Sequence, residues 1–141
     1  RLSSRSPAGD GTAENQAHTM IALRIMVVED EAYLGSLFGQ VLEGMGFIVC
    51  AIETTEARAI AAAELCKPDI MLVDIQLADG NGISAVSEIL RTSFVPHVFY
   101  SGDISGVQAS HPRSVAIQKP FRVSDLALAI ERALGGIPIF A

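Results

Sequence analysis

The chain has 141 residues, of which 50% are hydrophobic, and its formal net charge at pH 7 is −6. This length allows one domain, and the apolar content is enough for one packed core. The acidic balance disfavours direct binding to nucleic acid phosphates and suits a basic partner or a bound cation. The longest apolar runs are too short for a membrane-spanning helix.

The two ends of the chain differ from its middle. Residues 1–19 are dominated by polar side chains and small residues, so we expect a disordered leader or extension. Residues 20–141 are expected to form one domain. Within it, the apolar tail at 137–141 is expected to cover core surface or to contact a partner.

Strands and helices alternate from the start of this domain. Residues 24–28 are rich in β-branched side chains and predict a buried strand. Apolar residues at 34–45 then recur three and four positions apart, which predicts a helix that Gly44 and Gly46 end. Residues 47–51 predict a second strand.

A second helix is expected to begin after Thr54 or Thr55, because either side chain can accept hydrogen bonds as its N-cap. This helix runs through several alanines to Cys66 and ends before Pro68. The continuously apolar residues 70–73 predict a third strand that is buried on both faces.

The second half of the domain repeats this alternation. A turn-rich stretch at 78–82 precedes a third helix, and residues 98–100 and 115–117 predict the fourth and fifth strands. The last helix is expected to have Ser124 as its N-cap and to end at a glycine pair. Residues 102–113 lack a clear helical period, so we expect the fourth helix to be short or irregular.

Alternating strands and helices predict parallel βαβ units with helices on both faces of a sheet. We therefore expect a doubly wound, flavodoxin-like α/β fold with five parallel strands in the order 2-1-3-4-5. In such a sheet the functional groups gather at the carboxyl ends of the strands.

The two cysteines form no CxxC motif, which disfavours a disulfide scaffold or a zinc site. We expect Cys50 and Cys66 to be reduced side chains with a packing role. Reduced cysteines are typical of cytoplasmic proteins, so we expect a cytoplasmic location for this chain.

Charged and polar residues follow four of the predicted strands. Glu29 and Asp30 come after the first strand, and Asp74 ends the third. Ser101 ends the fourth strand, and Lys119 comes after the fifth. Because parallel strands place their carboxyl ends at one edge of the sheet, we expect these side chains to converge.

This set of residues has a specific chemistry. Clustered carboxylates repel one another unless a cation joins them, and Mg²⁺ is the usual intracellular divalent ion with oxygen ligands. Lys119 offers a point charge for an anion, and Ser101 can donate one hydrogen bond. A carboxylate nucleophile, Mg²⁺, an ammonium and a hydroxyl together indicate phosphoryl transfer to an aspartate.

Over residues 24–134 the sequence resembles the receiver domain of bacterial two-component response regulators and is similar to the chemotaxis regulator. The segments that carry this resemblance are 28–31, 72–74, Gly82, Ser101 and the Lys-Pro-Phe run at 119–121. The resemblance covers nearly all of the chain that we expect to be ordered.

The stretch 96–102 resembles in part the Pro-Phe-x-Phe-Ala-Thr-Gly motif of an alphaproteobacterial receiver subgroup. His97, Tyr100 and Ser101 differ from that motif. Members of the subgroup have a degenerate fourth helix and lack the aromatic switch residue of other receivers, whose position is Ala116 here.

The resemblance implies that a sensor histidine kinase or a phosphotransfer protein transfers a phosphoryl group from phosphohistidine to Asp74. It also implies a magnesium site. Asp30 and Asp74 would bind Mg²⁺ directly, and Glu29 would bind it through water. The backbone carbonyl of Gln76 would be a further ligand.

The same resemblance implies a bacterial signalling protein that promotes only its own phosphorylation and dephosphorylation, with Ser101 and Lys119 acting beside Asp74. The Lys119–Pro120 peptide is expected to be cis. Because no output domain follows Ala141, we expect a stand-alone module. It would change conformation for an unknown downstream protein, or act as a phosphate sink or shuttle, without binding nucleic acid or membrane.

Two other functions stay as alternatives. An aspartyl-phosphate hydrolase of related fold usually needs a second aspartate two residues after the nucleophile, where this chain has Gln76. A pseudo-receiver would bind partners without phosphorylation, which the set Asp30, Asp74, Ser101 and Lys119 disfavours. The acidic turn after the first strand also disfavours a flavin site, which needs a phosphate cradle there.

Overall fold

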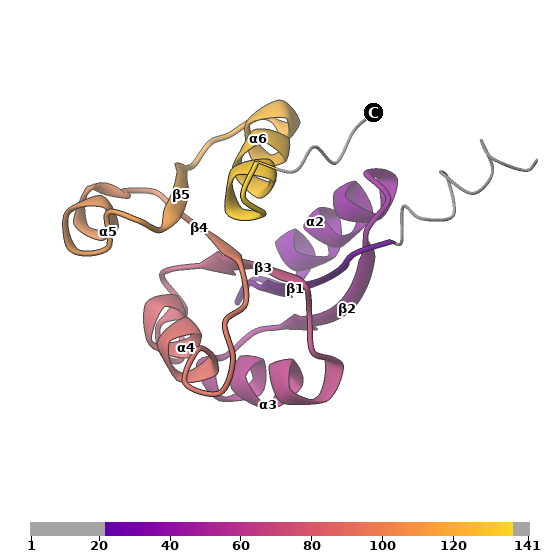
Figure 1. Cartoon of the computed structure of the whole chain (residues 1–141), viewed down its shortest axis with the longest axis horizontal. Coiled ribbons are helices and arrows are strands. Elements are labelled where there is room, and N and C mark those ends of the chain that lie inside the picture. The colour runs from indigo at the N-terminus through magenta and orange to yellow at the C-terminus, as the bar shows by residue number, and fades with distance from the viewer. Residues whose placement is uncertain (1–21, 137–141) are drawn as a thin grey trace, which may run out of the picture.

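The computed structural model describes residues 22–136, which form a five-stranded sheet covered by helices (Figure 1). The expected leader at 1–19 and the apolar tail at 137–141 lie outside the described residues. In chain order the elements are β1 (Arg24–Val28), α2 (Ala32–Gly44), β2 (Ile48–Glu53), α3 (Glu56–Cys66), β3 (Ile70–Asp74), α4 (Gly82–Ile89), β4 (His97–Ser101), α5 (Ser105–Ser110), β5 (Val115–Gln118) and α6 (Val123–Ala133).

All neighbouring strands pair in parallel, and their order in the sheet is β2-β1-β3-β4-β5. The predicted order 2-1-3-4-5 is therefore confirmed. Each strand is followed by a helix, which is the crossover that parallel neighbours require. As a result, all five strands end at the same edge of the sheet.

Side chains of the central strands are buried alternately on the two faces, as the strand period of two requires. Met26 and Met71 pack into the core beneath α3, α4 and α5. Ile25 and Ile70 pack into the core beneath α2 and α6. Figure 1 shows α3 and α4 on one side of the sheet and α2 and α6 on the other.

The second strand begins and ends later than its apolar run predicts. That run suggests a strand at 47–51, whereas β2 extends from Ile48 to Glu53. β2 extends to Glu53 because Val28 of β1 pairs with this residue. β1 is buried, so its backbone groups need hydrogen-bond partners along its whole length. Ile48 and Ile52 of this edge strand are partly exposed. The length of β2 therefore cannot be predicted from its buried apolar residues alone.

The two helix starts predicted from capping residues differ in outcome. Thr55 is the N-cap of α3, and its Oγ1 accepts the Arg58 backbone N–H at 3.1 Å. The prediction of Ser124 as a cap is wrong, because α6 begins earlier with Arg122 as its N-cap. The Asp125 carboxylate accepts the Arg122 backbone N–H at 2.9 Å and takes over the capping role.

The helix between the last two strands is short, as expected. It covers only Ser105–Ser110, and Val107 is its buried side chain. Such a helix depends on packing, because six residues are too few for independent stability. No helix within residues 22–136 has both the length and the apolarity that crossing a bilayer would require.

The cysteines form a disulfide between β2 and the last residue of α3, so the prediction of reduced Cys50 and Cys66 is wrong. Their Cα atoms are 6.2 Å apart, within the usual range for a bridge. Spacing along the chain did not reveal this, because it depends on where α3 ends over the sheet. The cysteines therefore no longer support a reducing compartment.

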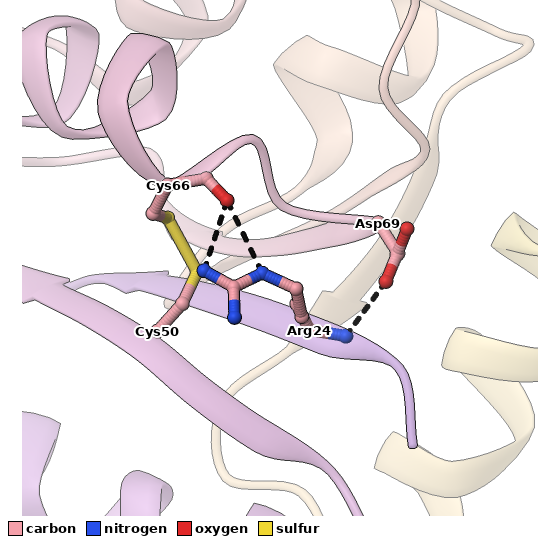
Figure 2. Close-up of a disulfide and its surroundings, with 4 residues drawn as sticks. All are labelled: Arg24, Cys50, Cys66 and Asp69. Atoms are coloured by element: carbon pink, nitrogen blue, oxygen red, sulfur yellow. Dashed lines mark hydrogen bonds between the residues drawn. A yellow bond between two sulfur atoms is a disulfide. The ribbon is translucent and has the colours of Figure 1, made fainter. Parts of the chain in front are cut away.

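The arginine at the start of β1 lies beside this bridge (Figure 2). The Arg24 guanidinium donates two hydrogen bonds, of 3.2 and 3.0 Å, to the carbonyl oxygen of Cys66. Its backbone N–H donates to the Asp69 carboxylate at 2.8 Å. These contacts satisfy the carboxyl end of α3 and join it to the first residue of β1 and to Asp69, which directly precedes β3.

The N-cap of α3 gives a first test of the fold. We expect Thr55→Ala to lower the free energy of unfolding by about 1 kcal/mol, because the Arg58 N–H then loses its acceptor. Thr54→Ala leaves this hydrogen bond intact and should change stability by less than about 0.5 kcal/mol. Urea unfolding followed by circular dichroism measures both. Equal effects of the two variants would contradict the assignment of the cap.

Candidate functional site

Three carboxylates meet at the edge where the strands end. Glu29 and Asp30 follow β1, and Asp74 is the last residue of β3. One carboxylate oxygen from each lies within 4.8 Å of the others. The parallel pairing of β1 with β3 produces this arrangement, because Val28 pairs with Val73 and the residues that follow them are Glu29 and Asp74.

Asp74, the carboxylate from β3, is only 3% exposed. The Lys119 ammonium, which follows β5, donates a hydrogen bond to Asp74 Oδ2 at 3.1 Å. The Gln76 backbone N–H donates to Oδ1 at 3.1 Å. Both carboxylate oxygens are thus held from different parts of the chain, and charge attraction strengthens the contact with Lys119.

Glu29 is even less exposed, at 1%, and is also held at both oxygens. The Tyr100 hydroxyl donates to Oε1 at 2.6 Å, and the Glu31 backbone N–H donates to Oε2 at 3.0 Å. Burial, with the negative charge of Asp74 added, raises the pKa of the Glu29 carboxyl above its usual value, while these hydrogen bonds oppose the shift. Burial and the contact with Glu29 raise the pKa of Tyr100, which therefore remains a donor.

Asp30 faces the loop between β3 and α4. Its Oδ2 accepts the Ala78 backbone N–H at 2.8 Å. The three carboxylates line a cavity of about 300 Å³. The residues around this cavity are Glu29, Asp30, Glu31, Leu34, Asp74, Gln76 and Lys119.

The loop between β3 and α4 is fixed by residues that the sequence analysis did not single out. Asn81 is the N-cap of α4, and its Oδ1 accepts the Ile83 and Ser84 backbone N–H groups. The Glu56 carboxylate, at the start of α3, accepts the Asn81 backbone N–H at 2.9 Å. An Asn directly before the predicted third helix was the available signal for the cap.

Among the described residues 22–136, Ser101 is not one of those that line this cavity. Its Oγ accepts the Asp103 backbone N–H at 3.3 Å, and its carbonyl oxygen accepts the Lys119 backbone N–H at 2.8 Å. The second contact sets the position at which Lys119 leaves β5. The Lys119–Pro120 peptide that follows is cis.

The donor set of the cavity suits a hard divalent cation. Carboxylate and carbonyl oxygens are the ligands that Mg²⁺ prefers, and one or two carboxylates are usual. Asp74 and Glu29 are buried, so water screens their mutual repulsion poorly. Lys119 brings one positive charge to three carboxylates, which leaves negative charge for a cation to offset.

Tyr100 is the contact residue that sequence reasoning missed. It stands in the buried β4 strand, directly before Ser101. A buried tyrosine usually requires a partner for its hydroxyl, which was the available signal. Its partner could not be read from the sequence, because Glu29 lies 71 positions away and two strands across the sheet.

Comparisons with known proteins identify the family and the relatives of this chain. The family model for the response regulator receiver domain matches residues 25–131. The phyllosphere-induced regulator PhyR of Methylorubrum extorquens is 33% identical over 119 residues, which are 81% of this chain and 44% of that protein. The transcriptional regulatory protein PdtaR of Mycobacterium tuberculosis is 30% identical over 122 residues, covering 84% of this chain and 60% of that protein.

Solved structures show the same likeness. The solution structure of the receiver domain of the Erythrobacter litoralis PhyR response regulator matches with a TM-score of 0.74 and 27% identity. The match covers 83% of this chain and 93% of that one. The chain thus has the size of a receiver domain and spans about half the length of the curated relatives it matches.

Gly82 tests how closely α4 approaches the site. A Cβ at this position would collide with the Asp74 carbonyl oxygen and the Val73 side chain. We expect Gly82→Ala to lower the free energy of unfolding by about 1–3 kcal/mol, because the helix must move away from β3.

Gly106→Ala in α5 is the matched control. A Cβ there would meet no heavy atom of the described residues 22–136 within 4 Å. This variant should leave stability unchanged or raise it by up to about 1 kcal/mol. Urea unfolding measures the free energy of unfolding of both variants. Equal values for Gly82→Ala and Gly106→Ala would contradict the close approach of α4 to β3 at Gly82.

Proposed function

This chain belongs to the response regulator receiver domain family, and we propose that it accepts a phosphoryl group on Asp74 with Mg²⁺ bound. The phosphoryl group comes from the phosphohistidine of a sensor histidine kinase or a phosphotransfer protein. The phosphorylated domain then acts on a downstream protein, or serves as a phosphate sink or shuttle.

One observation carries this proposal. The Lys119 ammonium contacts Asp74 at 3.1 Å in a cavity that Glu29 and Asp30 also line. A nucleophilic carboxylate thus has an anion-binding cation on one side and a cation-binding pair of carboxylates on the other. That combination suits a phosphoryl group, whose charge must be offset as it arrives.

The residues of the chain have separate parts in the transfer. One Asp74 carboxylate oxygen attacks phosphorus and forms the new P–O bond. The bond from phosphorus to the donor imidazole nitrogen breaks, and its electron pair leaves with the imidazole. Lys119 binds an oxygen of the transferred group, while the Gln76 N–H keeps the carboxylate oriented.

We assign the magnesium site to Asp30, Asp74 and the backbone carbonyl of Gln76, with Glu29 acting through water. When bound, Mg²⁺ neutralises charge on the phosphoryl oxygens during transfer. Asp30 and Glu29 orient this site from β1, and the Ala78 N–H holds Asp30 against the loop. The fit of the carboxylate oxygens within 4.8 Å supports this assignment.

Ser101 is assigned to the phosphorylated state. Its Oγ accepts the Asp103 N–H without using the hydroxyl proton, so the hydroxyl can donate a hydrogen bond to a phosphoryl oxygen when Ser101 moves toward Asp74. Such a movement would pull on the end of β4 and on the short α5 beyond it. Ala116, on the neighbouring strand, lacks the volume to act as an aromatic switch.

The partners of the domain follow from its family and its charge. The net charge of −6 supports a protein partner over a nucleic acid. We assign residues 20–141 to the domain and propose, from its family and not from its cysteines, a cytoplasmic signalling role without activity on other substrates. Hydrolase activity is disfavoured, because Gln76 stands where such enzymes usually have a second aspartate.

Asp74 as the acceptor can be tested by mass spectrometry. We expect the wild type, incubated with acetyl phosphate and Mg²⁺, to gain one phosphoryl adduct, and Asp74→Asn to gain none. Asp79→Asn, an exposed change in the following loop, should be labelled like the wild type. Persistent labelling of Asp74→Asn would move the acceptor to another carboxylate.

The magnesium site gives a second test. On Mg²⁺ titration we expect the backbone amide signals of residues 29–31 and 74–76 to shift first, and Asp30→Asn to abolish these shifts. The asparagine side chain of this variant can still accept the Ala78 N–H, so the loop is retained. Asp69→Asn, at the opposite end of β3, should titrate like the wild type. Unchanged shifts in Asp30→Asn would remove Asp30 from the ligand set.

A further inference from the structure

Tyr100 is a fully buried side chain at the carboxyl end of β4. Its ring lies edge-on to Phe38 of α2 and Phe121, with ring centroids 5.3 and 5.9 Å away. These neighbours leave the ring little room to turn, because aromatic side chains in a packed core occupy defined rotamers. The hydroxyl is therefore presented at a fixed point.

At that point the Tyr100 hydroxyl contacts the carboxylate of Glu29. The Tyr100 hydroxyl donates to Oε1 at 2.6 Å, while the Glu31 N–H donates to Oε2 at 3.0 Å. A carboxylate can accept about four hydrogen bonds, so these two donors orient Glu29 without filling its capacity. The lone pairs that remain can face the cavity that Glu29 shares with Asp30 and Asp74.

The ring of the same residue supports the opposite side of the site. The Lys119 Nζ lies 5.0 Å from the centroid of the Tyr100 ring and donates to Asp74 Oδ2. An ammonium over an aromatic face is attracted by the electrons of the ring. Tyr100 thus contacts the acidic side of the cavity through its hydroxyl and the basic side through its ring.

We propose that Tyr100 is a positioning residue of the site, which fixes Glu29 toward a bound Mg²⁺ and holds the Lys119 ammonium at Asp74. This inference rests on the proposed function, because it assumes that the carboxylate cluster binds Mg²⁺. It adds a residue that the resemblance does not supply, since the related motif has alanine at this position.

The hydroxyl is tested with Tyr100→Phe, which keeps the ring and removes the donor. Because Glu29 acts on Mg²⁺ through a water, Tyr100 lies one contact further from the ion than the partner of a direct ligand, whose loss typically weakens metal binding by about 10- to 100-fold. We therefore expect the Kd for Mg²⁺, measured from the Asp30 amide shift, to rise by a smaller factor, about threefold. Tyr33→Phe, which removes a hydroxyl from a side chain that is 73% exposed, should leave this Kd unchanged.

A double-mutant cycle separates positioning from a general structural role. Glu29→Ala, which removes the acceptor of the Tyr100 hydroxyl, should weaken Mg²⁺ binding, and adding Tyr100→Phe to it should weaken binding no further, because Tyr100 acts through the Glu29 carboxylate. A purely structural role would instead lower affinity by the same factor in both backgrounds. An unchanged Kd in Tyr100→Phe, or equal factors in both backgrounds, overturns the role of the hydroxyl.

NMR measurements on the wild-type protein test the same contacts without depending on whether a variant folds. The Tyr100 hydroxyl proton should be slow to exchange with water and should shift on Mg²⁺ titration with the same Kd as the Asp30 amide. The Lys119 Hε protons should lie upfield of their random-coil position because of the ring current, and Tyr100→Phe should retain that shift. A random-coil shift for Lys119, or a Tyr100 proton insensitive to Mg²⁺, overturns the corresponding contact.

The outcomes also separate this inference from the proposed function. A wild type whose amides do not respond to Mg²⁺ overturns both. A wild type that binds Mg²⁺, together with a Tyr100→Phe variant of equal affinity, overturns only the role of Tyr100.

Discussion

Parallel pairing of β1 with β3 brings three carboxylates to one edge of the sheet, with an oxygen from each within 4.8 Å of the others. Their repulsion is the constraint on which the site depends. Glu29 and Asp74 are both buried, so water screens the repulsion between their charges only weakly. The single Lys119 ammonium that contacts Asp74 offsets part of this charge and leaves the remainder for a cation.

The fold tolerates this cluster because it surrounds each carboxylate with donors. Every one of the three accepts one backbone N–H, and these come from Glu31 for Glu29, Gln76 for Asp74 and Ala78 for Asp30. Tyr100 and Lys119 add one side-chain donor each. The loop that supplies two of these N–H groups is itself pinned by the contact of Glu56 with Asn81. Stability of the core and geometry of the site are therefore linked through β3 and its loop.

Much of this architecture can be predicted from the sequence, and the failures have physical reasons. Short apolar runs and capping residues identified the strands and the start of α3 at Thr54 or Thr55, because each reflects a local pattern, and the alternation of strands with helices led to the sheet order. Ser124 was misjudged because a charged residue upstream, Arg122, can begin a helix when Asp125 accepts its N–H. The bridge between Cys50 and Cys66 and the contact of Tyr100 with Glu29 depend on how separate elements meet, which no local pattern records.

The stability of Asp30→Asn measures the repulsion most directly, because asparagine keeps the size of the side chain and its acceptor for the Ala78 N–H. In EDTA, we expect the free energy of unfolding of this variant to be about 1 kcal/mol higher than that of the wild type, since one of three like charges is removed. In saturating Mg²⁺ the order should reverse, because binding stabilises only the wild type. An Asp30→Asn variant that is equally or less stable than the wild type in EDTA would contradict the account.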